Sequence, residues 1–378
     1  MYNMKKHLFL PSYLHYILYI ILKQYLYILL IITCFTYNKT FGQITNEIQT
    51  KLIGGTVLPH HSSIAFLLAE YQKGFEIQYN QKNKHITQFD TLYNFPSFGI
   101  AYQHISLGNS LLLGYASQCY ATMRISLFSH TKHTISFEQD LGISYIHSSL
   151  LKSPYNTALS SPINFYAGID FQYTYSITNQ HSIISSVELS HISNGKIKTP
   201  NLGINSITFG LAYAYSAINN NAYSTKQILW HTHSIYTGLH GFYKSDDFLS
   251  TTKYPVISAL FEYEYRHTPK YGILLGFDGF YDQSHFALSP LPESTKLKLQ
   301  SSEYGIHTGL SAHYNNMSIY IATGKYIRTV GKKPPYYSRV GIRYAFNHFL
   351  INLSIKSHRT TADFLECGVG IFLFRSHH

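Results

Sequence analysis

One run of residues, INFYAGIDFQYTY at 163–175, limits strongly what this chain can fold into. Its odd-numbered positions carry apolar or aromatic side chains: Ile163, Phe165, Ala167, Ile169, Phe171, Tyr173 and Tyr175. Its even-numbered positions carry mostly polar or small ones: Asn164, Gly168, Asp170, Gln172 and Thr174, with Tyr166 the exception. Alternation with period two predicts a β-strand. Because this strand is well beyond the roughly five or six residues usual in soluble proteins, it suggests an unusually tall sheet.

Comparable runs follow one another along most of the chain. Long candidates lie at 134–146, 181–193, 204–215, 225–238, 253–266, 271–281, 301–313, 336–346 and 364–374. Shorter ones lie at 74–80, 96–105, 110–118, 121–129, 316–324 and 348–356. The chain is therefore predicted to be all-β.

The connections between these runs alternate in length. Short turns lie at 178–181, 267–270, 314–316 and 347–348, and long loops lie near 147–162, 194–203, 239–252 and 282–300. Short turns at one rim and long loops at the other are typical of outer-membrane barrels, as is a final strand that ends in aromatic residues. We therefore predict an antiparallel transmembrane β-barrel with an even number of strands, about 12–16.

The composition agrees with a membrane barrel. Only 12% of the residues are charged, against roughly 25% in soluble domains, while aromatic residues reach 16% with 35 Tyr and 24 Phe. A barrel in a membrane needs an apolar outer band and aromatic girdles; a Tyr-rich secreted sandwich is the alternative. The net charge of +11 is dispersed along the chain. Nucleic-acid binding would concentrate cations in a patch, so no nucleic-acid partner is expected.

The N-terminus is predicted to be a signal peptide over residues 1–42. Lys5, Lys6 and Lys23 precede the apolar run LYILLIITCF at 26–35, which is too short to span a membrane as a helix. Residues 43–378 are then expected to form a single barrel domain, with 43–70 periplasmic or irregular. Beyond the signal peptide, Cys119 and Cys367 have no metal-ligand spacing and are expected to be free thiols.

The stretch SHISNGKIKTPNLGIN at 190–205 places polar groups where the pattern calls for apolar ones. In the flanking strands the apolar register runs through Val187 and Leu189 to His191 and Ser193, and it begins at Asn205 in the next strand. In a membrane barrel this register faces lipid, where polar groups cost free energy unless they satisfy one another. The residues thus form either a functional constellation or ordinary polar groups at the headgroup level.

This stretch resembles the signature of the outer-membrane lipid A 3-O-deacylases, in particular their longer acyloxyacyl hydrolase-like relatives. The similarity lies in His-x-Ser-Asn-Gly followed by Pro-Asn-x-Gly: His191, Ser193, Asn194, Gly195, Pro200, Asn201 and Gly203. It extends over roughly residues 96–216. It implies an esterase that removes an acyl chain from lipid A in the outer leaflet of the outer membrane of a Gram-negative bacterium.

The resemblance also implies roles for individual residues. Ser193 would be the nucleophile and His191 its general base, and residues two apart on a strand share a face, as this requires. Asn201 and the backbone amides at Asn194–Gly195 would stabilise the oxyanion. The partner is then lipid A, or lipopolysaccharide, and no metal or other cofactor is expected.

Asn205 departs from the family pattern. The characterised members carry Glu at this position as the third member of the triad, whereas this chain has an amide. An amide can still accept from the histidine, but it cannot offset the imidazolium charge. Asp170 and Glu188 lie in the inward register, so neither replaces the missing acid.

Two alternatives follow from this departure. One is a barrel without enzymatic activity, such as a channel or a surface-binding protein, with a weakened site. The other is an esterase that acts on phospholipid.

Overall fold

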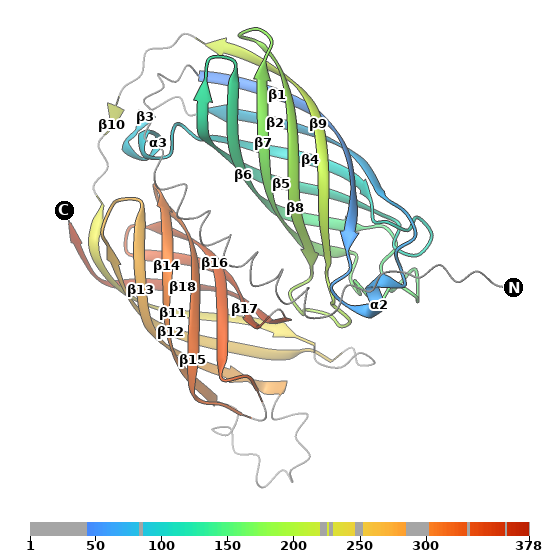
Figure 1. Ribbon diagram of the computed structural model, residues 1–378. Coiled ribbons are helices and arrows are strands. Elements are labelled where there is room, and N and C mark those ends of the chain that lie inside the picture. Colours follow the sequence, from blue (N-terminus) through green and yellow to red (C-terminus); the bar gives the residue numbers. More distant parts are fainter. Residues whose placement is uncertain are drawn as a thin grey trace, which may run out of the picture.

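In the computed structural model, almost every element is an antiparallel strand (Figure 1). It describes residues 44–82, 86–219, 225–226, 230–245, 252–284, 302–330, 333–359 and 361–377, so the expected signal peptide lies outside the described residues. Within these ranges, no helix has the length and apolar character needed to cross a membrane.

The strands close into two separate barrels of eight strands each. The first barrel contains β1 (Ile44–Leu58), β2 (Gln72–Lys82), β4 (Ser97–Ser106), β5 (Tyr115–His130), β6 (His133–Ile146), β7 (Ile163–Ser176), β8 (His181–Ser193) and β9 (Ile204–Asn219). The second contains β11 (His231–Lys244), β12 (Tyr254–Arg266), β13 (Tyr271–Asp282), β14 (Ser302–Tyr314), β15 (Met317–Arg328), β16 (Tyr336–Phe346), β17 (Phe349–His358) and β18 (Thr361–His377).

The remaining elements are short. Helix α2 (Ser62–Ala65) follows β1, and helix α3 (Gln88–Leu92) lies between β2 and β4. The two-residue strands β3 (Ile86–Thr87) and β10 (Thr225–Lys226) pair in parallel outside both barrels.

The prediction of a barrel is confirmed, but the expected single barrel is replaced by two. Closure is decided by β9, which pairs back along the whole of β1. The alternation and the hairpins are the same in one large barrel and in two small ones, so they do not reveal this closure. The segment 43–70, expected to be periplasmic or irregular, supplies β1, and the expected runs at 110–118 and 121–129 both fall on the single strand β5. The expectation therefore misses one strand of the first barrel and counts another twice.

Strand β1 was not predicted, because its inward face carries a lysine and two glycines lie near its end. Gln49, Lys51 and Ile53 are buried, while Ile48 and Leu52 are exposed on the outer wall. The alternation is therefore present, but Lys51 and Gly54–Gly55 weaken its apolar signal.

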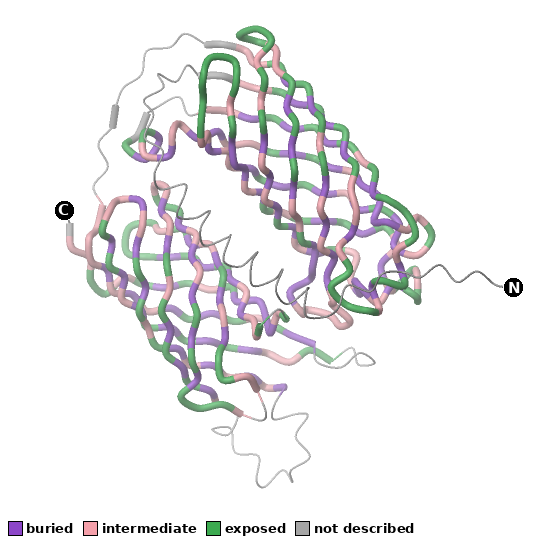
Figure 2. Tube along the Cα trace, in the orientation of Figure 1, coloured by how far each residue is buried: buried purple, intermediate pink, exposed green. Residues whose placement is uncertain are grey.

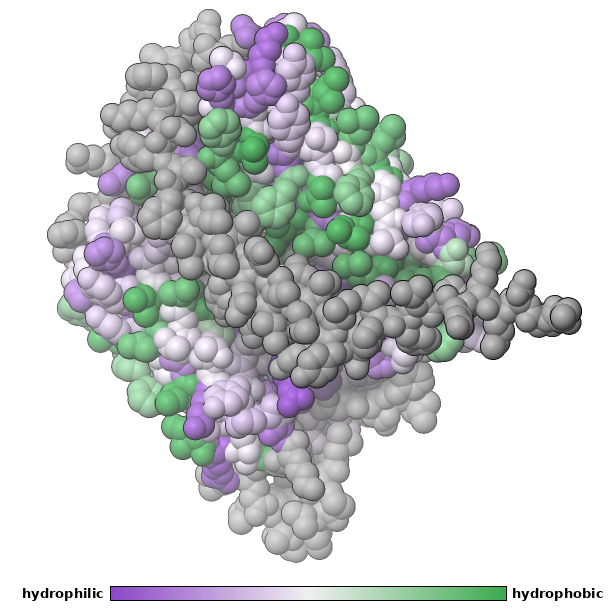
Figure 3. All heavy atoms as spheres, viewed as in Figure 1, coloured by the Kyte–Doolittle hydropathy of each residue, from purple (hydrophilic) through white to green (hydrophobic). Residues whose placement is uncertain are grey.

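Both barrels are polar inside and apolar outside. In β7 the even-numbered residues Asn164–Gln172 are buried, and the apolar register, including Ile163, Tyr173 and Tyr175, faces outward. Buried and exposed residues alternate along the strands (Figure 2). Hydrophobic side chains gather over the wall of the first barrel (Figure 3). A soluble sandwich has the opposite arrangement, with an apolar interior.

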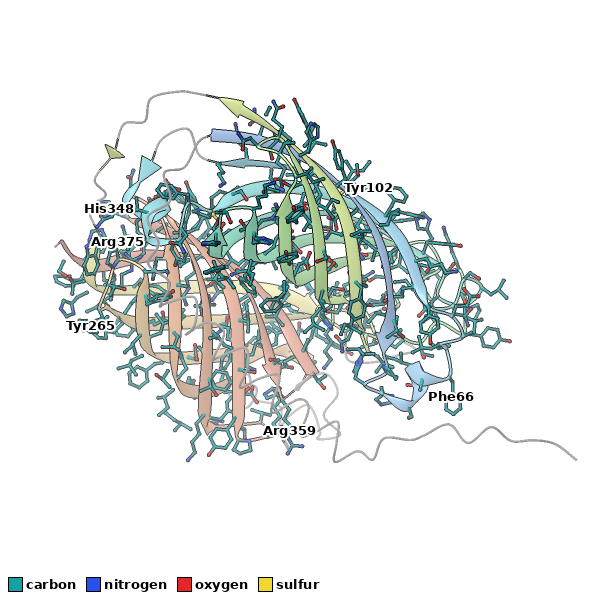
Figure 4. All side chains as sticks on the ribbon, turned by 45° about the horizontal axis from the view of Figure 1, so that its top comes forward. Phe66, Tyr102, Tyr265, His348, Arg359 and Arg375 are labelled. Atoms are coloured by element: carbon teal, nitrogen blue, oxygen red, sulfur yellow. The ribbon has the colours of Figure 1, made fainter. Side chains whose placement is uncertain are left out.

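Three histidines repeat one arrangement on the outer walls. Each of them, His133, His181 and His233, lies opposite a tyrosine of the neighbouring strand. Each bonds to the hydroxyl of a second tyrosine, two residues before the first in that strand, at 2.6–2.7 Å. These tyrosines are Tyr175 and Tyr173, Tyr215 and Tyr213, and Tyr265 and Tyr263. Tyr265 projects from the second barrel, as Tyr102 does from the first (Figure 4). All three sites lie near the rims with short turns, where amphipathic rings suit a membrane interface.

The barrels also meet rim to rim. At the rims with short turns, Lys270 Nζ donates to the Leu92 carbonyl at 3.1 Å and Tyr314 bonds to Asp90. At the rims with long loops, the Ser245 amide donates to the Lys196 carbonyl at 3.1 Å. Like rims in contact give the two barrels the same orientation, as a shared membrane requires.

Charged and polar side chains fill both interiors. In the second barrel, His307 lies between Glu262 and Asp278 at 2.8 and 2.7 Å. In the first, Lys51 bridges Glu76 and Asp170 at 3.0 and 3.1 Å. An eight-stranded barrel is just wide enough for its side chains to fill it. The described interiors therefore give no support to the channel alternative.

Arg339 of the second barrel provides a test of this interior. Its guanidinium contacts Glu366 at 2.6 Å and Asp278 at 3.0 Å, all three groups being buried. We expect Arg339→Leu to destabilise the barrel by about 3–5 kcal/mol, because two buried carboxylates lose the guanidinium charge that they share. Urea unfolding followed by heat-modifiable gel mobility measures this. The exposed Arg359 gives the control variant Arg359→Leu; equal midpoints for both variants would contradict the expectation.

Candidate active site

The predicted site lies at the long-loop rim of the first barrel, where β8 ends and β9 begins. His191 is exposed on the outer wall. Ser193, in the same register, is only 6% exposed. Between the two strands runs the loop 194–203, the site loop. The outward register of both side chains is as the sequence predicts.

His191 and Asn205 are joined directly. They are partners in the β8–β9 ladder, and the distance between His191 Nδ1 and Asn205 Oδ1 is 2.6 Å. Since an amide oxygen can only accept, the proton of this bond resides on His191 Nδ1. The opposite ring nitrogen, Nε2, is then unprotonated in the neutral ring and available as a base.

The Ser193 hydroxyl completes the group on the same face, two residues from His191. No side-chain hydrogen bond joins Ser193 to His191 among the described residues. Catalytic hydrogen bonds often tighten only when substrate is bound, so this geometry is compatible with a Ser–His pair. Phe165 lies opposite Ser193 in the β7–β8 ladder. An aromatic side chain is therefore the cross-strand neighbour of the Ser193 side chain.

Asn194 and Asn201 hold the site loop in place. The side-chain oxygen of Asn201 accepts from the Asn194 backbone amide at 3.0 Å. The buried Asn194 side chain donates to Ser161 Oγ at 3.1 Å and to the Lys198 carbonyl at 2.9 Å. The Asn194 amide, one of the expected oxyanion donors, therefore already donates to Asn201 Oδ1. That bond leaves the Asn201 Nδ2 and the Gly195 amide as the candidate donors.

Gly203 allows the site loop to pack against the His191 ring. It adopts a φ of 76°, and a Cβ there would lie 2.7 Å from His191 Cε1. Gly195, at a φ of 62°, would meet only ordinary contacts at 3.8 and 3.9 Å, to Leu365 and Phe165. The absence of a side chain at Gly203 therefore makes room for the His191 ring.

We expect Gly203→Ala to lower turnover by about 10²-fold, because the new methyl group displaces the imidazole and misplacement of this order has such an effect. Rates of lipid A deacylation, the activity that the motif's resemblance implies, measure the effect in the folded variant. Gly108→Ala is the matched control: Gly108 lies at the same rim with a φ of 79°, and its Cβ would contact Glu70, Leu68 and Val57 instead. Equal losses in both variants would show that backbone strain alone is responsible.

His60 is a member of the site that the sequence analysis did not find. Asn205 Nδ2 lies 3.0 Å from His60 Nδ1, and His60 Nε2 lies 2.8 Å from the Leu202 carbonyl oxygen. Only the β1–β9 register, which places Leu58 opposite Asn205, reveals that residues just after β1 reach this site.

The carboxylates of the first barrel do not join the site. Asp170 is bound to Lys51 in the interior, and Glu188 is bound to Tyr166 there. Both inward predictions are confirmed. In the described part of the chain, no group of His, Cys, Asp and Glu residues is arranged to hold a metal ion.

The second barrel borders the site loop. Thr199 Oγ1 lies 3.3 Å from Ser245 Oγ, and Leu365 of β18 lies beside Gly195. The neighbours of Leu365, Phe364 and Glu366, point into the barrel, so Leu365 points outward. It is nevertheless only 4% exposed. Leu365 is therefore an outer-wall residue covered by the first barrel.

Comparison with known families separates the chain at the same place as the two barrels. Residues 73–214 match the family model described as lipid A 3-O-deacylase (PagL), and residues 230–376 match the one described as acyloxyacyl hydrolase, C-terminal domain. The chain belongs to the lipid A 3-O-deacylase family. It is one of the longer, acyloxyacyl hydrolase-like members, and its second barrel carries the match to the C-terminal domain.

Solved structures show more distant similarity to this family member. The outer-membrane enzyme PagL is 14% identical, with a TM-score of 0.33, over 44% of this chain and 98% of that one. Neisserial surface protein A is 9% identical, with a TM-score of 0.32, over 46% and 96%. No curated protein is a significant match. The chain is thus an outer-membrane β-barrel protein by its family and its strand pairing.

Proposed function

We propose that this protein is an outer-membrane serine esterase that removes an acyl chain from lipid A, with Ser193 as nucleophile and His191 as general base. The observation that carries the proposal is the bond between His191 Nδ1 and Asn205 Oδ1 at 2.6 Å, on the outer wall beside Ser193. Membership of the lipid A 3-O-deacylase family supports the substrate. Its place would be the outer membrane of a Gram-negative bacterium, with lipid A in the outer leaflet as partner.

The first step forms an acyl-enzyme. His191 Nε2 takes the Ser193 proton as the hydroxyl oxygen attacks the ester carbonyl of the acyl chain. The C–O bond to the sugar then breaks, and the departing sugar oxygen receives the proton from His191. Water, deprotonated by the same nitrogen, releases the fatty acid and restores Ser193. The net change is one ester and one water to one hydroxyl and one fatty acid.

The negative charge on the tetrahedral intermediate needs hydrogen-bond donors. Asn201 is held by the Asn194 amide through its oxygen, so its Nδ2 is the donor end that remains for the oxyanion. The Gly195 amide is the second candidate. Asn205 contributes differently: it orients His191 but carries no charge to offset the imidazolium.

The amide at position 205 leads to a directional prediction. We expect Asn205→Glu to keep or raise turnover, because a carboxylate accepts from His191 Nδ1 and also stabilises the imidazolium that forms. Initial rates of wild type and variant on purified lipid A measure this. A collapse of activity in a folded Asn205→Glu barrel would show that the amide has a role a carboxylate cannot fill.

The function itself is tested by mass spectrometry of lipid A from cells with and without the protein. The expected result is the loss of the mass of one acyl chain. In a parallel arm, the same cells are assayed for fatty acid released from phospholipid. Release from phospholipid with unchanged lipid A would replace the proposed substrate, and no change in either arm would contradict an esterase.

A further inference from the structure

We infer that His60 is a positioning residue that fixes the orientation of the Asn205 amide and, through it, the tautomer of His191. This inference rests on the proposed function, because it concerns the base of the same site. It assigns a role to a histidine that lies outside the family motif and 131 residues from His191 in the sequence.

Four groups are linked by hydrogen bonds in the order Leu202 carbonyl, His60, Asn205 and His191. The donor and acceptor of each bond follow from the first group, which can only accept. The Leu202 carbonyl can only accept, so His60 Nε2, at 2.8 Å, carries a proton. A neutral imidazole has one protonated nitrogen, so Nδ1 of such a ring is an acceptor. It accepts a hydrogen bond from Asn205 Nδ2 at 3.0 Å. This directs Asn205 Oδ1 toward His191 Nδ1 and leaves His191 Nε2 free of its proton.

The strand register explains why these three residues meet. Asn205 lies in β9 between β8 and β1, with His191 as its partner on one side and Leu58 on the other. His60 follows Leu58 by two residues, at the start of the loop after β1. The Asn205 side chain is thus held between two imidazoles, one on β8 and one just after the end of β1.

The need for such a residue comes from the amide itself. A carboxylate offers two equivalent acceptors, so it supports the productive tautomer in either orientation. An amide has one acceptor and one donor end. A reversed Asn205 would donate to His191 Nδ1, which would move the ring proton to Nε2, and His191 could not then take the Ser193 proton. A chain with Asn in place of Glu therefore requires an acceptor beside Nδ2, and His60 supplies it.

The test compares His60→Ala and His60→Lys in two backgrounds, with Asn205 and with Asn205→Glu. Lysine has donors only, so it favours the reversed amide. With Asn205 we expect turnover to fall about 3–10-fold in the Ala variant and about 10–100-fold in the Lys variant, as the loss of one hydrogen bond and the gain of a charged competitor imply. In the Asn205→Glu background, the turnover of both variants should stay within about 3-fold of that of Asn205→Glu alone, because both oxygens of a carboxylate accept hydrogen bonds.

His61→Lys is the matched control. It adds the same charge one residue away, and His61 contacts Ser63 at 2.6 Å instead of Asn205. Equal losses in both backgrounds would overturn the inference, because they would mean that His60 only supports the loop through Leu202. An unaffected His60→Lys, or an inactive Asn205→Glu in a folded barrel, would overturn it as well.

A second readout separates this inference from the proposed function. In histidine-labelled protein, ¹⁵N shifts identify which nitrogen of His191 is protonated, and the His191→Ala spectrum assigns the signal. We expect the Nδ1–H form in wild type and the Nε2–H form in His60→Lys. An unchanged tautomer contradicts the role of His60 whether or not lipid A is hydrolysed. An inactive wild type with the expected tautomers contradicts only the proposed function.

Discussion

Ser193→Ala is expected to abolish deacylation, lowering the rate by about 10⁴-fold or more, as loss of the nucleophile does in serine hydrolases. The removed hydroxyl is the only group assigned to form the bond with the acyl carbon. Purified wild type and variant are compared by the mass of lipid A after incubation. The barrel should keep its heat-modifiable mobility, because the substitution removes one oxygen at the end of a strand.

Ser185→Ala is the matched control for this result. Ser185 faces outward on the same strand and is exposed, but it lies nearer the other end of β8. Its variant should act on lipid A at the wild-type rate. A Ser193→Ala protein that still removes an acyl chain would contradict the assignment of the nucleophile, and equal losses in both variants would point to damage to the barrel.

Asn205→Leu should have the second largest effect. Leucine matches the size of asparagine and suits a lipid-facing wall, yet it leaves His191 Nδ1 without an acceptor. We expect turnover to fall by about 10²–10⁴-fold, the range set by loss of the orienting residue in serine hydrolases. The Michaelis constant should change little, because Asn205 contacts the base and has no assigned contact with the substrate.

Steady-state rates over a range of lipid A concentrations, in detergent micelles, separate these two constants. The His191→Ala variant provides the lower limit for a site without its base. An Asn205→Leu enzyme as fast as wild type would mean that His191 needs no orientation. A variant with an unchanged turnover number and a much higher Michaelis constant would place Asn205 in substrate binding instead.

The strands could be predicted from sequence because the residues of a membrane-barrel strand alternate between lipid and the barrel interior. Lipid on one side and a polar interior on the other impose alternation, as in β7, and the hairpin turns at 178–181 and 267–270 occur where expected. Closure into two barrels could not be predicted, because pairing of β1 with β9 leaves no mark in either strand alone.

The candidate site was predictable where it is local in sequence. His191, Ser193 and Asn205 share one outward register, and their side could be worked out by counting from Val187. His60 could not be found in this way, because only the pairing of β1 with β9 brings it to Asn205, which lies 145 residues later in the chain. The contact of Gly203 with His191 was hidden for a related reason, since it arises from the path of the site loop over the ring.

The most direct test of the proposed trio is covalent labelling with a fluorophosphonate, which reacts with activated serine hydroxyls. The folded protein is labelled, digested and mapped by peptide mass spectrometry. The expected adduct lies on Ser193, with strongly reduced labelling in His191→Ala and Asn205→Leu. An adduct on another serine, or labelling of Ser193 that is unchanged without His191, would contradict hydrolysis by these three side chains.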